Sequence, residues 1–130
     1  MKNLVEQYAS VIYDRKLSSM NVFFEGAISY ENMMKVFHYE FRMVRYYRLQ
    51  KCLIDVRNIQ GITPEIKEYI NHIWFYTISE EGMKNIAFVG PENILDEVFD
   101  TTKQSPERES ALKIKYFKDK EAAEGWLKQA

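Results

Sequence analysis

The chain has 130 residues, which is a usual length for one domain with one hydrophobic core. Its formal net charge is −1, and this disfavours nucleic acid as a partner because domains that bind phosphate backbones are usually basic. The single cysteine, Cys52, excludes an internal disulfide and a multi-cysteine metal site and fits a reducing compartment. No signal-peptide pattern opens the sequence, and no stretch approaches the roughly 20 apolar residues that span a bilayer. We therefore expect a cytoplasmic protein with no integral membrane segment.

The first third of the chain predicts a hairpin followed by a long helix. Residues 8–13 and 20–25 are rich in aromatic and β-branched side chains, which favour strands. The polar run 14–19 between them predicts the turn of an antiparallel hairpin. Ser29 is a suitable N-cap for a helix that ends near residue 50.

Strands and helices then alternate. Residues 52–56 and 86–89 are short apolar runs, typical of strands that are buried on both faces. Between them, Thr63 is predicted to cap a second helix, with Pro64 in its first turn. A third helix is predicted over 90–102.

The C-terminal part predicts a loop, an edge strand and a final helix. Residues 103–110 are polar and predict a mobile loop, and residues 113–117 alternate charged and apolar side chains as edge strands do. Asp119 is predicted to cap a last helix. Its inward residues are expected to be Ala122, Ala123, Trp126 and Leu127. The order β-β-α-β-α-β-α-β-α predicts a single α/β domain over residues 1–130, with a mixed, mostly parallel sheet and an antiparallel N-terminal hairpin.

The long first helix has more apolar surface than one sheet face requires. One stripe is sufficient for that packing, and it consists of Met33, Phe37, Phe41 and Val44. Met43, Tyr46 and Tyr47 lie beside this stripe, and Phe75 is predicted to point away from the core side of the second helix. These four residues are a candidate contact surface for a partner. Ordinary packing against neighbouring elements is an equally good explanation.

Polar residues gather at the end of the predicted central strand. Asp55, Arg57, Asn58 and Thr63 lie where parallel sheets usually bind ligands, and they form a candidate recognition patch. The alternative is local: Asp55 and Arg57 form an ion pair, while Asn58 and Thr63 satisfy backbone groups of a turn and a helix cap.

Catalytic and metal-binding patterns are absent from the sequence. His38 and His72 fall on different predicted helices and have no metal-ligand spacing. We therefore predict a non-enzymatic protein without a cofactor or metal. An enzyme built from Asp55, Arg57 and His72 is the remaining alternative.

Four segments carry a resemblance to a known family: residues 53–65, the pair Trp74-Phe75, residues 86–89 and residues 116–127. Together they resemble the SpoIIAA-like branch of the STAS (sulfate transporter and anti-sigma factor antagonist) family over roughly residues 8–128. The resemblance implies a small mixed-sheet domain that acts as a bacterial regulatory or interaction module. Some relatives with a similar core are thought to hold apolar ligands.

The sequence departs from the family pattern at the regulatory motif. In the phosphorylated members an Asp-Ser-Ser/Thr-Gly-like motif follows the central strand, and its serine accepts phosphate from a kinase. Here that region is Gly61-Ile62-Thr63-Pro64-Glu65, where Thr63 is the nearby hydroxyl and is expected to be engaged as a helix cap. The resemblance therefore does not imply the usual phosphoserine switch.

Two functional hypotheses follow. The first is a STAS-like module that binds a protein partner or forms a homodimer through its strand-end loops and aromatic helix surface. The second is a carrier or sensor of a small apolar, lipid-like ligand. That ligand would lie between the helices and the sheet, beside Met33, Met34, Phe37 and Phe41.

Overall fold

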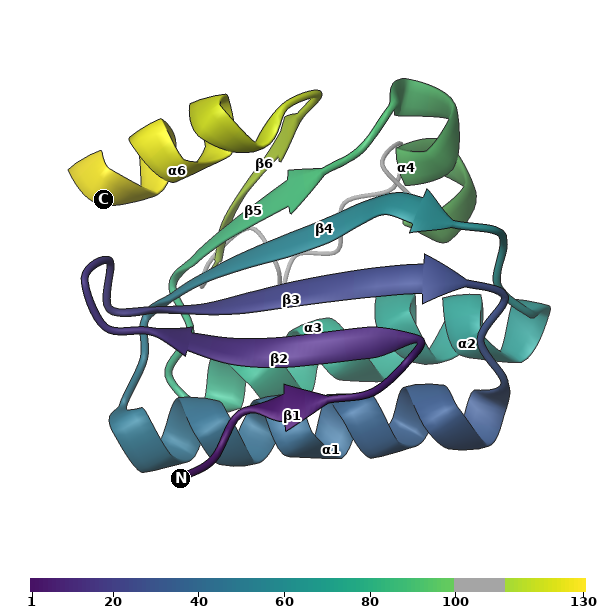
Figure 1. The fold of residues 1–130 in the computed structure, drawn as a ribbon, viewed down its shortest axis with the longest axis horizontal. Helices are drawn as coiled ribbons and strands as arrows, with labels where there is room; N and C mark the ends of the chain where they lie inside the picture. Colours follow the sequence, from purple (N-terminus) through teal and green to yellow (C-terminus); the bar gives the residue numbers. More distant parts are fainter. Residues whose placement is uncertain (100–111) are drawn as a thin grey trace.

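A six-stranded mixed sheet organises the computed structural model, which describes residues 1–99 and 112–130 (Figure 1). The strands lie side by side in chain order: β1 (Leu4–Val5), β2 (Ala9–Asp14), β3 (Ser19–Gly26), β4 (Lys51–Ile59), β5 (Asn85–Val89) and β6 (Lys113–Phe117). The β1–β2 and β2–β3 pairs are antiparallel, and the remaining pairs are parallel. Leu53 lies opposite Ala87 in a parallel register, so the predicted parallel neighbours and the predicted α/β class are confirmed.

Helices cover both faces of this sheet. They are α1 (Tyr30–Tyr47), α2 (Pro64–Tyr69), the π-helical turn η1 (Ile70–Trp74), α3 (Phe75–Glu80), α4 (Glu92–Val98) and α6 (Lys120–Gln129). The main core lies between the sheet and the layer formed by α1 and the continuous α2–η1–α3 segment. A smaller core lies on the opposite face, where α6 packs on β4 and β5 through Ala123 and Leu127 (Figure 1). No helix in the described ranges is both long and apolar enough to cross a membrane.

The predicted helix caps are present. The side chains of Ser29, Thr63 and Asp119 each accept a hydrogen bond from the backbone N–H three residues later, at the starts of α1, α2 and α6. Each bond satisfies one of the N–H groups that a helix start leaves without an intrahelical partner. Gly82 has a φ of 108°, the left-handed conformation expected of a glycine after a helix.

Two smaller predictions were incomplete or wrong. The two-residue strand β1 was not predicted, because Leu4 and Val5 are too few to produce an alternating pattern. Ala122 was expected to face inward but is exposed, whereas Ala123 is fully buried. The predicted loop 103–110 and the predicted end of the third helix near 102 lie outside the described residues.

The second helix is not a regular α-helix, and this overturns the predicted position of Phe75. At η1 the backbone N–H of Phe75 bonds to the carbonyl of Ile70, five residues earlier, so one extra residue is accommodated in the turn. That extra residue rotates everything after it relative to a continuous α-helix. Phe75 is consequently buried at 2% exposure, while Ile73 is 47% exposed.

Candidate functional site

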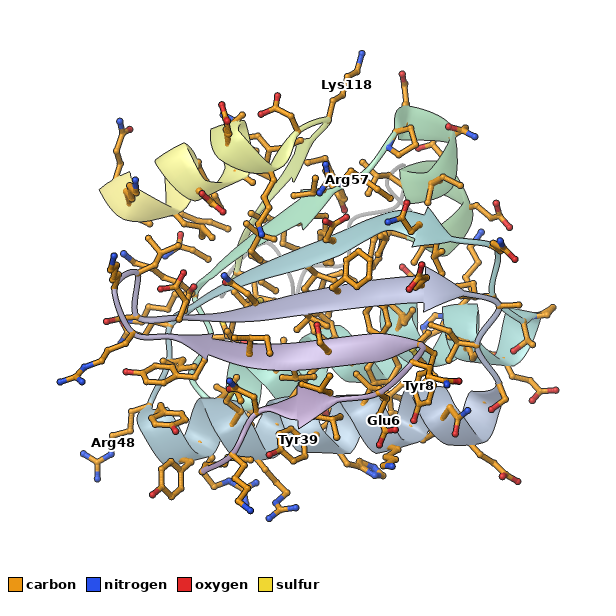
Figure 2. All side chains as sticks on the ribbon, in the orientation of Figure 1. Glu6, Tyr8, Tyr39, Arg48, Arg57 and Lys118 are labelled. Atoms are coloured by element: carbon orange, nitrogen blue, oxygen red, sulfur yellow. The ribbon has the colours of Figure 1, made fainter. Side chains whose placement is uncertain are left out.

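The polar patch at the end of β4 is largely an internal ion pair. Asp55 is buried, and its carboxylate accepts hydrogen bonds from the backbone N–H of Arg57 and from the Arg57 guanidinium at 2.7–3.2 Å. The guanidinium is 42% exposed and points out from the sheet (Figure 2). Its hydrogen bonds with Asp55 raise the pKa of Arg57 above the ordinary value. Both carboxylate oxygens of Asp55 therefore accept hydrogen bonds from Arg57, and part of the Arg57 side chain remains exposed.

The other two predicted patch residues do not join this pair. Asn58 is exposed and follows a bulge in β4, where two residues of β4 lie beside one of β3. The Thr63 hydroxyl accepts the Ile66 N–H as the cap of α2, as the sequence predicted. The structure brings Asp55 and Arg57 together but leaves Asn58 and Thr63 as separate surface positions.

The N-terminal segment covers most of the excess apolar surface of α1. Tyr47 stacks on Tyr13 with ring centroids 3.8 Å apart, and its hydroxyl donates to the carbonyl of Met1 at 2.9 Å. Tyr39, which Figure 2 shows beside β1, likewise donates to the carbonyl of Lys2. Of the predicted contact residues, Met43 is fully buried and Phe75 nearly so, and as placed they cannot form a docking surface. Tyr46 remains 64% exposed.

The main core contains a small cavity. It lies between α1, η1, the end of α4 and strands β3, β4 and β5. Its lining is formed by Phe24, Met33, Phe37, Glu40, Ile54, Val56, Ile59, Ile62, Ile70, Trp74, Phe88, Val98 and Phe99. The space available to the centre of a water molecule is about 20 Å³, enough for one water. The described part of this lining is apolar except for one carboxyl group and one indole N–H.

That carboxyl group belongs to Glu40. Its side chain is fully buried, and Oε1 accepts a hydrogen bond from Trp74 Nε1 at 2.8 Å. Oε2 has no hydrogen-bond partner among the described residues. A buried oxygen without a partner costs about 1–3 kcal/mol of folding free energy, so this arrangement needs an explanation.

Burial changes the protonation of Glu40. The loss of hydration raises its pKa from 4.5 to about 8, and the hydrogen bond from Trp74 opposes this only in part. At neutral pH the carboxyl group is therefore mainly in its neutral, protonated form. Burial and the nearby Glu40 also raise the pKa of the Cys52 thiol well above its ordinary value, so Cys52 behaves as the small core residue that the sequence predicted.

Glu40 could have been found in the sequence. It follows Phe37 by three residues and precedes Val44 by four, so it falls within the apolar stripe of α1. A carboxylate in such a stripe signals a buried charge that requires a partner. Trp74 could not have been identified as that partner, because the two residues lie 34 positions apart on different helices.

Metal chemistry gains no support from the described residues. No group of three or more His, Cys, Asp and Glu side chains in residues 1–99 and 112–130 could hold a metal ion. His38 and His72 are both exposed.

The fold and the cavity define a class of protein: a small α/β domain with a mixed sheet, an antiparallel hairpin and a terminal helix on the opposite face. The SpoIIAA-like family profile matches residues 19–128, so the chain belongs to the SpoIIAA-like family. Among solved structures, it resembles an uncharacterised protein of the DUF3478 family with a SpoIIAA-like fold from Shewanella loihica PV-4. The two chains are 15% identical with a TM-score of 0.60, and the match covers 92% of this chain and 94% of that one. This likeness shows a shared fold alone. A comparison with curated proteins gives no match.

Proposed function

We propose that the protein is a non-enzymatic interaction module of the SpoIIAA-like family that acts as a homodimer through the outer face of its helical layer. The observation that carries this proposal is the exposure of two large apolar residues on one helical segment. Ile73 is 47% exposed and Tyr76 is 60% exposed, and they are separated by one helical turn. Neighbouring exposed apolar residues of this size mark interaction surfaces more often than single ones do.

The charges around these two residues favour a second copy of the chain as the partner. The outer side of α2–α3 carries the exposed acidic residues Glu68 and Glu80, whereas the outer side of α1 carries the exposed Arg42. None of the three forms an ion pair with another described residue. A two-fold axis would place α1 of one copy against α2–α3 of the other, so that opposite charges surround the apolar centre on both sides.

Light scattering coupled to size exclusion tests this proposal. The chain should elute as a dimer at micromolar concentration, and the double variant Ile73→Ser/Tyr76→Ser should elute as a folded monomer. Tyr46→Ser is the matched control, because Tyr46 is as exposed as Tyr76 but lies at the end of α1. Arg42→Glu should weaken the dimer. A wild-type chain that remains monomeric at several hundred micromolar would rule out the homodimer.

A second function, a carrier or sensor of a small apolar ligand, is favoured by the core cavity. The cavity lies between the helices and the sheet, and Met33 and Phe37 contribute to its lining. Met34 is half-buried and Phe41 is buried, and neither lines the cavity. Xenon, an apolar probe of small size, should shift the NMR signals of the methyl groups of Ile54 and Ile59, which line the cavity. Unchanged signals under xenon pressure would remove this second function.

A further inference from the structure

Among the described residues that line the core cavity, Glu40 presents one buried hydrogen-bonding atom without a partner in the described part of the chain. Glu40 Oε1 is occupied by the indole N–H of Trp74, and Oε2 has no partner among the described residues although it is fully buried. The other lining side chains in residues 1–99 and 112–130 are hydrocarbon, thioether or aromatic groups, so this part of the chain supplies no second polar group for Oε2. A molecule in this cavity would meet an apolar wall and one polar anchor.

The protonation state of Glu40 determines which chemical group fits that anchor. Burial raises the pKa of Glu40 to about 8, so at neutral pH the carboxyl group carries a proton. Oε1 already accepts a hydrogen bond, which leaves the proton on Oε2 as a hydrogen-bond donor. Burial first, and the nearby Glu40 to a smaller extent, raise the pKa of Cys52 on β4 and of Tyr69 on α2, so both groups are neutral at this pH. The complementary ligand group is thus an uncharged acceptor oxygen.

We propose that Glu40 anchors a small uncharged ligand with an apolar body and one hydrogen-bond acceptor, such as a ketone or an alcohol. The proposal rests on the second function above, a ligand site in the core. Without ligand, the cavity is large enough for one water molecule. A larger molecule requires the wall to move, and Met33 is the lining side chain best suited to this because methionine is unbranched and flexible.

Three small probes distinguish hydrogen bonding to Glu40 from apolar binding in the cavity. They are 2-butanone as the neutral acceptor, sec-butylammonium as a cation of similar size, and xenon as an apolar atom. Binding is measured from methyl shifts of Ile54 and Ile59 and from Trp74 fluorescence in a Trp126→Phe background. Trp126 lies on the opposite face of the sheet against Phe117, so its replacement leaves the cavity intact.

The two key variants are Glu40→Gln and Glu40→Leu. Glutamine can accept from Trp74 with its oxygen and donate to the ligand with its NH₂ group, so Glu40→Gln should bind 2-butanone within threefold of the wild type. Leucine has no polar atom, so Glu40→Leu should bind it at least tenfold more weakly while binding xenon normally. Sec-butylammonium should bind the wild type at least tenfold more weakly than 2-butanone.

Each outcome has one meaning. Equal affinity of the wild type and Glu40→Leu for 2-butanone would refute the role of Glu40 as a hydrogen-bonding anchor, but it would still be consistent with a ligand site in the cavity. Stronger binding of the cation would overturn the neutral-acceptor class. Failure of xenon and 2-butanone to perturb either methyl group would overturn both the anchor and the ligand site. If Glu40→Leu does not fold, the ratio of the affinities for 2-butanone and for sec-butylammonium, measured in the wild type and in Glu40→Gln, still decides the ligand class.

Discussion

Replacement of Glu40 by glutamine should remove a pH dependence from the stability of the protein. In the folded state the pKa of Glu40 is raised to about 8, compared with 4.5 for an exposed glutamate. Between these values the folded protein binds one more proton than the unfolded chain, so stability is complete below pH 4.5 and falls as the pH rises toward 8. Glutamine has nearly the same shape, keeps an acceptor for Trp74 Nε1 and does not titrate.

The magnitude follows from the two pKa values. From pH 5 to pH 8, the proton linkage of Glu40 should lower the free energy of unfolding of the wild type by about 3.5 kcal/mol, at about 1.36 kcal/mol per pKa unit. The decrease in the free energy of unfolding of Glu40→Gln between pH 5 and pH 8 should be smaller by this amount. Other titrating groups contribute equally to both proteins, so they cancel in the difference.

Urea unfolding followed by circular dichroism measures this difference at several pH values, with a check that the m-value is unchanged. Glu40→Gln should be more stable relative to the wild type at pH 8 than at pH 5. Parallel stability curves across this range would show that Glu40 titrates normally and that the cavity is hydrated. Asp55→Asn is a useful comparison, because Asp55 is also a buried carboxylate but is paired with Arg57.

Three further substitutions test local features of the fold. Phe75→Ser should destabilise the monomer by about 4 kcal/mol because it empties a buried site, whereas Ile73→Ser should change stability by about 0.5 kcal/mol or less; equal effects would contradict the π-helical register. Thr63→Ala should cost about 1 kcal/mol through loss of the α2 cap, and Thr63→Ser should restore it. Arg57→Ala should cost about 1–2 kcal/mol because Asp55 keeps its buried charge without the guanidinium, and adding Asp55→Asn should recover most of the loss. All three are measured by urea unfolding at a protein concentration low enough to keep the chain monomeric.

The sequence predicted the features that depend on local chemistry. Ser29 and Thr63 were identified as caps because a hydroxyl before an amphipathic run has one main structural use, and the apolar runs around Leu53 and Ala87 predicted parallel strands. The position of Phe75 was predicted wrongly, because a regular α-helix turns 100° per residue and the π-helical turn breaks that period.

Features that depend on contacts between distant segments could be predicted only in part. The covering of Tyr47 by Met1 joins residues 46 positions apart, and the two residues of β1 gave no pattern that indicated it. Glu40 is different, because its place in the apolar stripe of α1 is visible in the sequence. Its role still required Trp74, whose hydrogen bond with Glu40 joins two helices and residues 34 positions apart.

The π-helical turn itself can be tested by removing its extra residue. Deletion of Ile73 places Phe75 four residues after Ile70, the spacing of a regular α-helix, so Phe75 and Ile78 should keep their places in the core. Trp74 then follows Ile70 by three residues instead of four. Its indole should turn away from Glu40, so that the hydrogen bond is lost.

The deleted chain should therefore fold cooperatively but lose about 1–3 kcal/mol, because both oxygens of Glu40 are then buried without partners. The hydrogen bond from Trp74 lowers the pKa of Glu40 in the native protein, so its loss should move that pKa further upward from about 8. Carbon-13 NMR of the Glu40 carboxyl group measures this change. Ile73→Ala is the matched control, since it removes the same exposed side chain and keeps the chain length. A deletion variant with an unchanged Glu40 pKa would show that the extra residue does not position Trp74, and the link between the π-helical turn and the cavity would be lost.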